Sequence, residues 1–252
     1  MAASEKAKAY NKKMFPYRET LFKQTDPEFI ERFDNFAFDD VISTVDLDDI
    51  SRFHAIIASL IGVGGVDEYR MMIAAAMRFG VTPAEIKEIA YQSVAYIGIG
   101  RAYPFLHATN EVFVENGIEM PLASAQTTTD ENRREKGEQA QIEIFGEQMR
   151  GYAESGDKDT VHIRRWLAEN CFGDYYTRKV LDYKKREMIT FCFLAAQGGC
   201  EPQLISHIEA NLRLGNDREY LIKIASQILP YIGYPRALNA LACIEETTAK
   251  QR

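Results

Sequence analysis

The chain has 252 residues, enough for two domains of ordinary size, and its formal net charge is −7. This acidic balance predicts that neither nucleic acid nor an anionic membrane surface is a partner, because both attract basic proteins. The four cysteines include no C-x-x-C pair, and no apolar run reaches the roughly 18 residues of a membrane span, so a cytoplasmic protein with reduced thiols is expected.

Apolar residues recur at helical spacing along almost the whole chain, and alternating β-branched residues are nearly absent, which predicts an all-α fold. In the first half we expect helices at 50–62, 67–79, 82–97 and 101–115. Residues 121–130 are polar and threonine-rich and should form a linker, followed by a charged amphipathic helix at 131–152 and a loop at 151–157. The second half should hold helices at 183–197 and 202–214, one from 216 or 217 to 231, and a last helix that begins at Pro235.

The second half of the sequence repeats the first. When the numbering is shifted by 135, Tyr96-Ile97-Gly98 falls on Tyr231-Ile232-Gly233 without a gap. This duplication predicts one helical unit that is used twice and packed as a pseudo-dimer. We place copy one and its N-terminal helices at residues 1–120, a linker and connecting helix at 121–157, and copy two at 158–252. Positions where the copies agree should be structural, and positions where they differ are candidates for chemistry.

The clearest difference between the copies lies early in one helix. In copy two, Cys200, Gln203 and His207 are three and four residues apart, whereas copy one has Met72 in place of the histidine. On a helix that begins near residue 202, Gln203 and His207 share one face and Cys200 lies just before the first turn. The helix dipole and the imidazole would both lower the pKa of that thiol. We therefore predict that Cys200 and His207 face a shared cavity where the copies meet.

Two motifs of copy two carry a family resemblance. The pattern G-G-x-x-x-x-L-x-x-H runs over residues 198–207, and Y-x-G-x-P-x-A-x-N-A runs over residues 231–240. Their order resembles the carboxymuconolactone decarboxylase family, which includes the alkylhydroperoxidase D-like proteins, and residues 172–178 resemble the segment that precedes the domain in its decarboxylase branch. The resemblance implies an all-α domain. Because single-copy members assemble as trimers or hexamers of dimers, it also implies a homotrimer of the two-copy chain.

In the decarboxylase branch, two histidines and an arginine surround a lactone acid. His207 matches the first histidine, Gln227 stands where the second would be, and Gln92 repeats that replacement in copy one. Arg52 matches the arginine in copy one, and Arg186-Glu187 occupies that neighbourhood in copy two.

The resemblance adds further candidates for substrate binding. Glu68 matches an acidic residue four positions before the family histidine, where copy two has Gln203. Tyr231 begins the second motif. Together with Gln227, these residues complete the predicted substrate-binding set.

Such a site could act on a small carboxylate, lactone or oxo acid without a cofactor. Arg178 or Arg186 would bind a carboxylate, and an apolar pocket would favour the loss of carbon dioxide. His207 or Glu187 would then protonate the resulting dienolate, or move a proton between carbons in an isomerisation. The sequence shows no dinucleotide or phosphate-binding motif and no cluster of three metal ligands, so we expect neither cofactor nor metal.

Two other functions stay open at this stage. Peroxidase-like relatives carry C-x-x-C-x-x-x-H on this face, which Cys200 and His207 match, but Gln203 replaces the second cysteine. Cys192 lies about 8–12 Å away along its helix, beyond the reach of a disulfide. A thiol-dependent peroxidase would therefore use Cys200 and an external thiol. The third possibility is a catalytically silent helical scaffold.

Several of these residues could also be purely structural. Glu187 could pair with Lys184 or Arg186 on an exposed face. The remaining candidates for core or interface packing are Tyr175, Tyr176, Tyr96 and Tyr231. Because Gln92 and Gln227 agree between the copies, we expect them to hydrogen-bond to buried backbone.

Overall fold

The computed structural model describes residues 2–17 and 20–249. Met1 and residues 250–252, at the outer ends of the two predicted copies, lie outside the described residues. Within the described part every regular element is helical, which confirms the predicted all-α class. No helix in these two ranges is long and apolar enough to cross a membrane.

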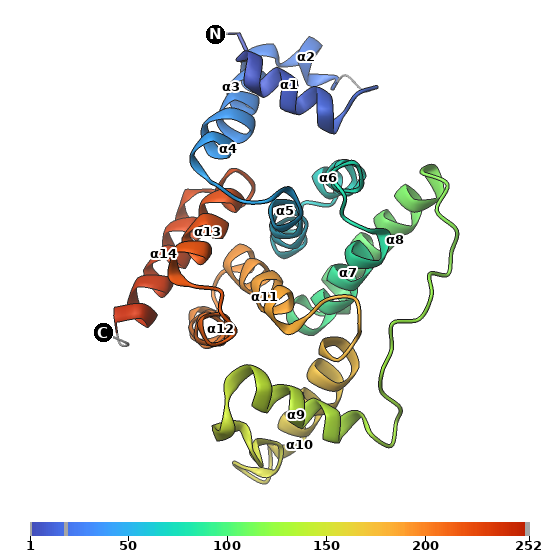
Figure 1. Ribbon diagram of the computed structural model, residues 1–252, viewed down its shortest axis with the longest axis vertical. Helices are drawn as coiled ribbons and strands as arrows, with labels where there is room; N and C mark the ends of the chain where they lie inside the picture. The colour runs from blue at the N-terminus through green and yellow to red at the C-terminus, as the bar shows by residue number, and fades with distance from the viewer. Residues whose placement is uncertain (1, 18–19, 250–252) are drawn as a thin grey trace.

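Four core helices recur in the same order in both copies. Copy one has α5 (Asp49–Val63), α6 (Val66–Arg78), α7 (Pro83–Ile97) and α8 (Ile99–Glu115). Copy two has α11 (Tyr183–Gln197), α12 (Glu201–Arg213), α13 (Arg218–Ile232) and α14 (Tyr234–Ala249). The predicted helices agree with these bounds to within two residues. Helices α5 and α11 pack against each other at the centre of the molecule (Figure 1).

The structure refines the register of the repeat. The N-cap aspartates of α5 and α11, Asp48 and Asp182, are 134 residues apart, whereas the N-caps of α7 and α13, Thr82 and Asp217, are 135 apart. Copy two therefore has one extra residue in its α11–α12 turn, at residues 198–200 against residues 64–65 of copy one. Along the central helices a shift of 134 pairs equivalent positions, so Arg52 corresponds to Arg186.

Shorter elements flank the two cores at opposite ends of the molecule (Figure 1). The N-terminal end has α1 (Glu5–Met14), α2 (Phe22–Thr25), α3 (Pro27–Asn35), the π-helix η1 (Phe36–Asp40) and α4 (Val41–Thr44). The other end has α9 (Arg133–Phe145), the 3-10 turns η2 (Glu147–Met149) and η3 (Tyr152–Glu154), α10 (Val161–Trp166) and the π-helix η4 (Leu167–Tyr176). The helix predicted at 131–152 thus ends early, because Gly146 takes a positive φ of 105° and turns the chain.

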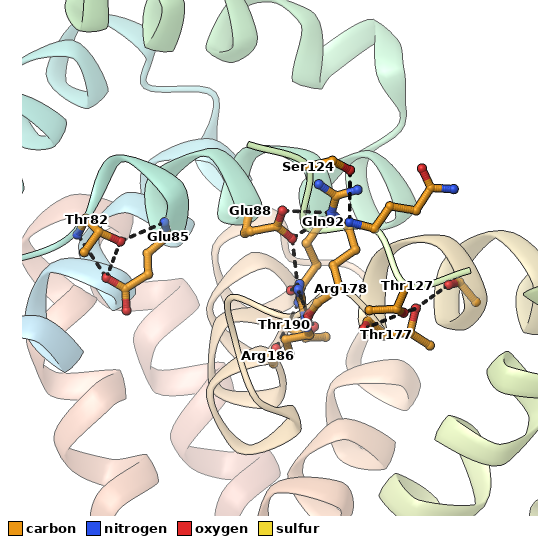
Figure 2. Close-up of polar contacts among 12 residues, drawn as sticks. Thr82, Glu85, Glu88, Gln92, Ser124, Thr127, Thr177, Arg178, Arg186 and Thr190 are labelled. Carbon is orange, nitrogen blue, oxygen red and sulfur yellow. Dashed lines mark hydrogen bonds and ion pairs between the residues drawn. The ribbon is translucent and has the colours of Figure 1, made fainter. Parts of the chain in front are cut away.

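The predicted linker is fastened to copy two. Thr127 Oγ1 donates to the carbonyl of Thr177 over 2.9 Å, as Figure 2 shows, and the backbone of Lys179 donates to Ala125. Next along the chain, α9 packs closely on η4: a Cβ at Gly137 or at Gly173 would collide with backbone carbonyl oxygens of the other helix. This close crossing fixes the aromatic residues that α9 and η4 present to copy two.

One apolar core runs through both copies. Its largest fully buried side chains include Phe53 of α5 and Phe191 and Phe193 of α11, each with no exposed surface. Because the central helices share this core, burial across the copy boundary stabilises both halves together.

Candidate functional site

A cavity of about 780 Å³ opens between the two copies and the α9–η4 layer, and we call it the His207 cavity. Copy one contributes the end of α7, with Ala95 and Tyr96. The segment predicted as linker contributes Gln141, Phe145, Gln148, Met149 and Tyr152. Copy two contributes residues of η4, the end of α11 and the first turns of α12, including Cys171, Phe172, Cys200, Gln203 and His207.

His207 and Glu187 form a hydrogen-bonded pair at the wall of this cavity. Nδ1 of His207 lies 2.7 Å from Oε2 of Glu187, whose side chain is fully buried. The Nδ1–H donates to the carboxylate, so Nε2 is the nitrogen with the free lone pair. Oε1 of Glu187 has no hydrogen-bond partner among the described residues.

Asn211 holds the backbone around this pair. Its amide nitrogen donates to the carbonyl of Glu187 over 2.9 Å and to the carbonyl of His207 over 2.7 Å. This one side chain therefore ties α11 to α12 at the two positions that carry the pair, which restricts the geometry of the imidazole.

Aromatic rings surround the imidazole. The rings of Tyr96 and Phe145 meet it edge to face, with centroids 5.6 and 5.4 Å away. These contacts come from copy one and from α9, so both parts of the chain shape the site. An apolar wall excludes water from the pair and strengthens its electrostatic effect on a bound molecule.

A chain of hydroxyl groups leads from the copy interface to the cavity. Gln92 Nε2 donates to Thr190 Oγ1 over 2.9 Å, Thr190 lies 2.6 Å from the Tyr176 hydroxyl, and the two tyrosine hydroxyls of Tyr176 and Tyr96 are 2.5 Å apart. Gln92 Nε2 also donates to the carbonyl of Arg186. As expected, this glutamine satisfies buried backbone.

The structure places both predicted carboxylate-binding arginines outside the cavity. Arg186 is fully buried, and its guanidinium donates to Gln92 Oε1 and to Glu88 Oε2, both over 2.9 Å. The Nε of Arg178 binds the two oxygens of the same Glu88 carboxylate over 2.8 and 2.9 Å (Figure 2). Their charge is compensated by a carboxylate from copy one, and neither arginine lines the cavity.

Three other candidates, Glu68 of copy one and Gln227 and Tyr231 of copy two, lie outside the His207 cavity. Gln227 accepts a hydrogen bond from Arg52, which mirrors the Arg186–Gln92 pair. Tyr231 packs its ring against Phe33. Glu68 is partly buried, and burial, together with the charge of a neighbouring aspartate, raises its pKa. None of Gln227, Tyr231 and Glu68 lines the His207 cavity.

Both Cys200 and Gln203 line the cavity, as does a second thiol that the sequence analysis did not consider. Cys200 Sγ donates to the carbonyl of Leu194 over 3.5 Å, and burial raises the pKa of this thiol, in contrast to the lowering we predicted. Cys171, on η4, has its pKa raised to about 12 by burial. Cys192 is a free thiol that is fully buried in the core.

Other features of the site were also missed. Tyr96 was interpreted as packing at a helix end, and Phe145 lies in a segment that we read as a connection. The sequence gives little indication that Tyr96 and Phe145 line the site, because their role depends on the residues that pack beside them. Among the residues at 2–17 and 20–249, no group of three or more His, Cys, Asp or Glu side chains could hold a metal ion.

The fold and the site thus define an all-helical tandem protein in which one of two equivalent positions carries a buried acid–base pair. The family model for the carboxymuconolactone decarboxylase family matches twice, at residues 27–111 and 162–246. The chain therefore belongs to that family as a two-copy member.

Two individual proteins support this assignment. The chain is 35% identical over 97 residues to 4-carboxymuconolactone decarboxylase of Acinetobacter baylyi, an alignment that covers 38% of this chain and 70% of the relative. It also resembles the crystal structure of a Burkholderia xenovorans protein described as a gamma-carboxymuconolactone decarboxylase subunit. That likeness has a TM-score of 0.51 at 20% identity, covers 98% of both chains, and bears on the fold alone.

Proposed function

We propose that the chain is a cofactor-free general acid–base enzyme with one site, the His207 cavity. Its reaction is the decarboxylation or isomerisation of a small carboxylate, lactone or oxo acid. The observation that carries this proposal is the 2.7 Å contact between His207 Nδ1 and the buried Glu187 carboxylate at the wall of a cavity of about 780 Å³. Membership of a family that includes a named decarboxylase supports it.

The pair can move a proton without any added reactant. In an isomerisation, Nε2 of His207 removes a proton from a carbon next to a carbonyl, and the electron pair of the broken C–H bond forms an enolate. The imidazolium, held by the Glu187 carboxylate, then returns the same proton to another carbon of the conjugated system. In a decarboxylation, His207 first takes up a proton from solvent at Nε2. The electron pair of the breaking C–C bond then forms the dienolate as carbon dioxide leaves, and the imidazolium gives its proton to the dienolate carbon.

The thiol-dependent peroxidase is the weaker alternative. A peroxidatic thiol needs to reach the thiolate form, and burial raises the pKa of Cys200. The imidazole that could have activated it is bound to Glu187 at Nδ1. The scaffold alternative does not account for a buried glutamate and histidine placed at a cavity wall, because such a pair costs desolvation energy that an apolar pair avoids.

The test compares His207→Gln with the wild type on two probes. Carbon dioxide release from 4-carboxymuconolactone reports decarboxylation, and proton NMR of α-angelica lactone in D₂O reports isomerisation. On the probe that is turned over, we expect H207Q to be slower by at least about 100-fold, because it loses the general base. His107→Gln, at an exposed position of α8, is the matched control and should keep the wild-type rate.

A wild-type rate in H207Q contradicts the proposal. A wild-type chain that turns over neither probe also contradicts it and favours the scaffold.

We further propose that the chain is cytoplasmic and assembles as a homotrimer. Two exposed apolar pairs support the assembly: Ile99 and Tyr103 at the start of α8, and Tyr234 and Leu238 at the equivalent positions of α14. All four side chains are more than half exposed, and large apolar residues that recur at equivalent surface positions are typical of an interface. A solution mass equal to the 28.7 kDa of one chain, measured by light scattering, would contradict the trimer.

A further inference from the structure

The lining of the His207 cavity contains no lysine or arginine. Its polar groups are neutral amides and hydroxyls, a histidine, two thiols and one carboxylate, that of Glu209. The fully buried carboxylate of Glu187 lies directly behind the imidazole. A carboxylate ligand would therefore enter a cavity with no cationic side chain to compensate its charge.

The two nearby arginines are not available for that task. Arg178 and Arg186 bind the same Glu88 carboxylate, and Arg186 also donates to Gln92 Oε1 (Figure 2). If either arginine moved into the cavity, the buried Glu88 carboxylate would lose one of its two cationic partners. Breaking a buried ion pair in this way is strongly destabilising. An anion bound in the cavity would not offset that loss, because neither arginine lines the cavity and so neither can contact the anion.

The cavity offers a neutral hydrogen-bond donor instead. Arginine nitrogens can only donate, so the Arg186 Nη1 contact fixes which end of the Gln92 amide is oxygen. Gln92 Nε2 then donates to Thr190 Oγ1. Thr190 is fully buried, so the arrangement that leaves no buried hydroxyl proton unpaired directs the threonine proton to Tyr176 and the Tyr176 proton to Tyr96.

When the hydrogen bonds run in this direction, the hydroxyl proton of Tyr96, at the cavity end, is left for another partner. In this arrangement the Tyr96 oxygen accepts from Tyr176, and the Tyr96 O–H can donate to a ligand in the cavity. Tyr96 lines the cavity next to His207, and Cys171, which also lines it, lies 4.0 Å from the Tyr96 oxygen. Hydrogen bonds that run in one direction polarise one another and make the terminal donor stronger.

We propose that the His207 cavity takes an uncharged carbonyl compound whose oxygen accepts a hydrogen bond from Tyr96. This inference rests on the acid–base function proposed above and narrows it to proton transfer next to a neutral ketone or lactone. Tyr96 stabilises the negative charge that develops on the oxygen when His207 removes the neighbouring proton. Because Tyr96 belongs to copy one, the site of copy two is incomplete without the first copy.

The test is a binding experiment with two ligands that share one ring system. 2-Acetonaphthone, labelled with ¹³C at its carbonyl, is neutral, and 2-naphthoate is an anion. Calorimetry gives both affinities, and isotope-edited infrared difference spectra give the carbonyl stretching frequency of the bound ketone. We compare the wild type with Tyr96→Phe and with Tyr176→Phe. Tyr231→Phe is the matched control, because it changes the equivalent tyrosine of copy two, which lies outside the cavity.

We expect the wild type to bind the ketone at least about tenfold more tightly than the naphthoate, and to lower its carbonyl frequency on binding. Y96F should lose about tenfold in ketone affinity and most of the frequency shift. Y176F should keep most of the affinity but reduce the shift, because it removes only the group that polarises Tyr96. Y231F should change neither quantity.

Three results would overturn the inference: naphthoate binding at least as tightly as the ketone, an unchanged frequency shift in Y96F, or no binding of either ligand. None of these readouts depends on turnover. A failure of the acid–base proposal would therefore appear only in the rate experiment, and a failure of this inference would appear only in the binding experiment.

Discussion

Where copy two has Glu187 on α11 and His207 on α12, copy one has Phe53 on α5 and Met72 on α6. Both copy-one side chains are buried to 1% exposure or less. The ring of Phe53 packs on Phe79 with centroids 4.8 Å apart, and the ring of Tyr10 of α1 also packs on Phe79, with centroids 5.3 Å apart. The same helices thus enclose packed hydrocarbon in copy one and a hydrogen-bonded acid–base pair beside a cavity in copy two.

The features that the copies share have a different character. In each copy, an arginine of the central helix donates to a glutamine of the other copy, as Arg52 does to Gln227 and Arg186 to Gln92. These crossed contacts tie the copies together in both directions. The shared arginine–glutamine pairs therefore hold the pseudo-dimer together, whereas the proposed Glu187–His207 acid–base pair lies at positions that differ between the copies.

Even the shared contacts are not fully symmetrical. Arg186 has a carboxylate partner in Glu88, whereas Arg52 donates its second nitrogen to the carbonyls of Val45 and Leu47. The residue equivalent to Glu88 is Lys223, which pairs with Glu219 on its own helix. Copy one thus supplies both the acid that neutralises the arginines of copy two and the tyrosine that enters its cavity.

The largest expected effect comes from making copy two resemble copy one. In the double variant Glu187→Met/His207→Met, both members of the pair become apolar, and we expect turnover to fall by at least about 100-fold. The melting temperature should stay the same or rise, because a buried ion pair is replaced by apolar groups of similar volume. Rates on the two lactone probes and a thermal melt measure the two quantities.

A change in copy one should give the opposite pattern. Phe53→Leu removes packing volume from its core and should lower the free energy of unfolding by about 1 kcal/mol while turnover is kept. If E187M/H207M still turned over substrate at the wild-type rate, the chemistry would lie elsewhere in the chain.

The sequence was sufficient to predict much of this comparison, because a repeat supplies its own internal reference. The helix at 183–197 was predicted to the residue, and His207 stood out because its counterpart is Met72. Cys200 and Gln203 were placed on the same cavity for the simpler reason that helical spacing puts them there. Such features depend on local periodicity, which a sequence displays.

What the sequence did not reveal depends on contacts across the copies. Tyr96 and Tyr231 look alike in the repeat, but the Tyr96 hydroxyl meets that of Tyr176, which in turn meets Thr190. The residue equivalent to Thr190 is Ile56. Arginine side chains suggested a carboxylate site, and only the fold shows that one glutamate from the other copy binds them both. The α9 segment lines the cavity because glycines let it cross η4 closely. This is a tertiary contact, and no periodic pattern in the sequence marks it.

A second prediction concerns His54, whose counterpart in copy two is Met188. His54 is 1% exposed, its Nε2 lies 3.6 Å from Glu85 Oε1, and burial outweighs that carboxylate to lower its pKa to about 4. The unfolded chain therefore binds a proton between about pH 6.5 and 4 that the folded chain does not. Stability is fully present above pH 6.5 and is lost as the pH falls through this window.

His54→Met should remove that dependence. Between pH 7 and pH 5, the wild type should lose about 2 kcal/mol more of its free energy of unfolding than the variant does. Urea titrations at the two pH values measure the difference, with His107→Gln as the exposed control. Equal losses in the wild type and in H54M would show that His54 is not the source of the acid sensitivity.

The smallest effects test whether two copies that differ in chemistry still unfold as one unit. Thr82 caps α7 in copy one through a reciprocal pair of hydrogen bonds with Glu85, and Asp217 caps α13 in copy two by accepting from the Tyr220 backbone over 2.7 Å. Thr82→Ala and Asp217→Ala should each cost about 1 kcal/mol, and D217A should cost slightly more because it also loses a charge at a helix N-terminus.

Calorimetry can then show which transition each cap belongs to. Because one apolar core and the crossed arginine–glutamine pairs join the copies, we expect a single transition that both variants move to lower temperature, and the double variant should show the sum of the two shifts. Two transitions, of which T82A moves one and D217A the other, would mean that each copy is stable alone. In that case copy one could unfold while α11 and α12 persist, and the Glu187–His207 pair would survive the loss of Tyr96 from its cavity.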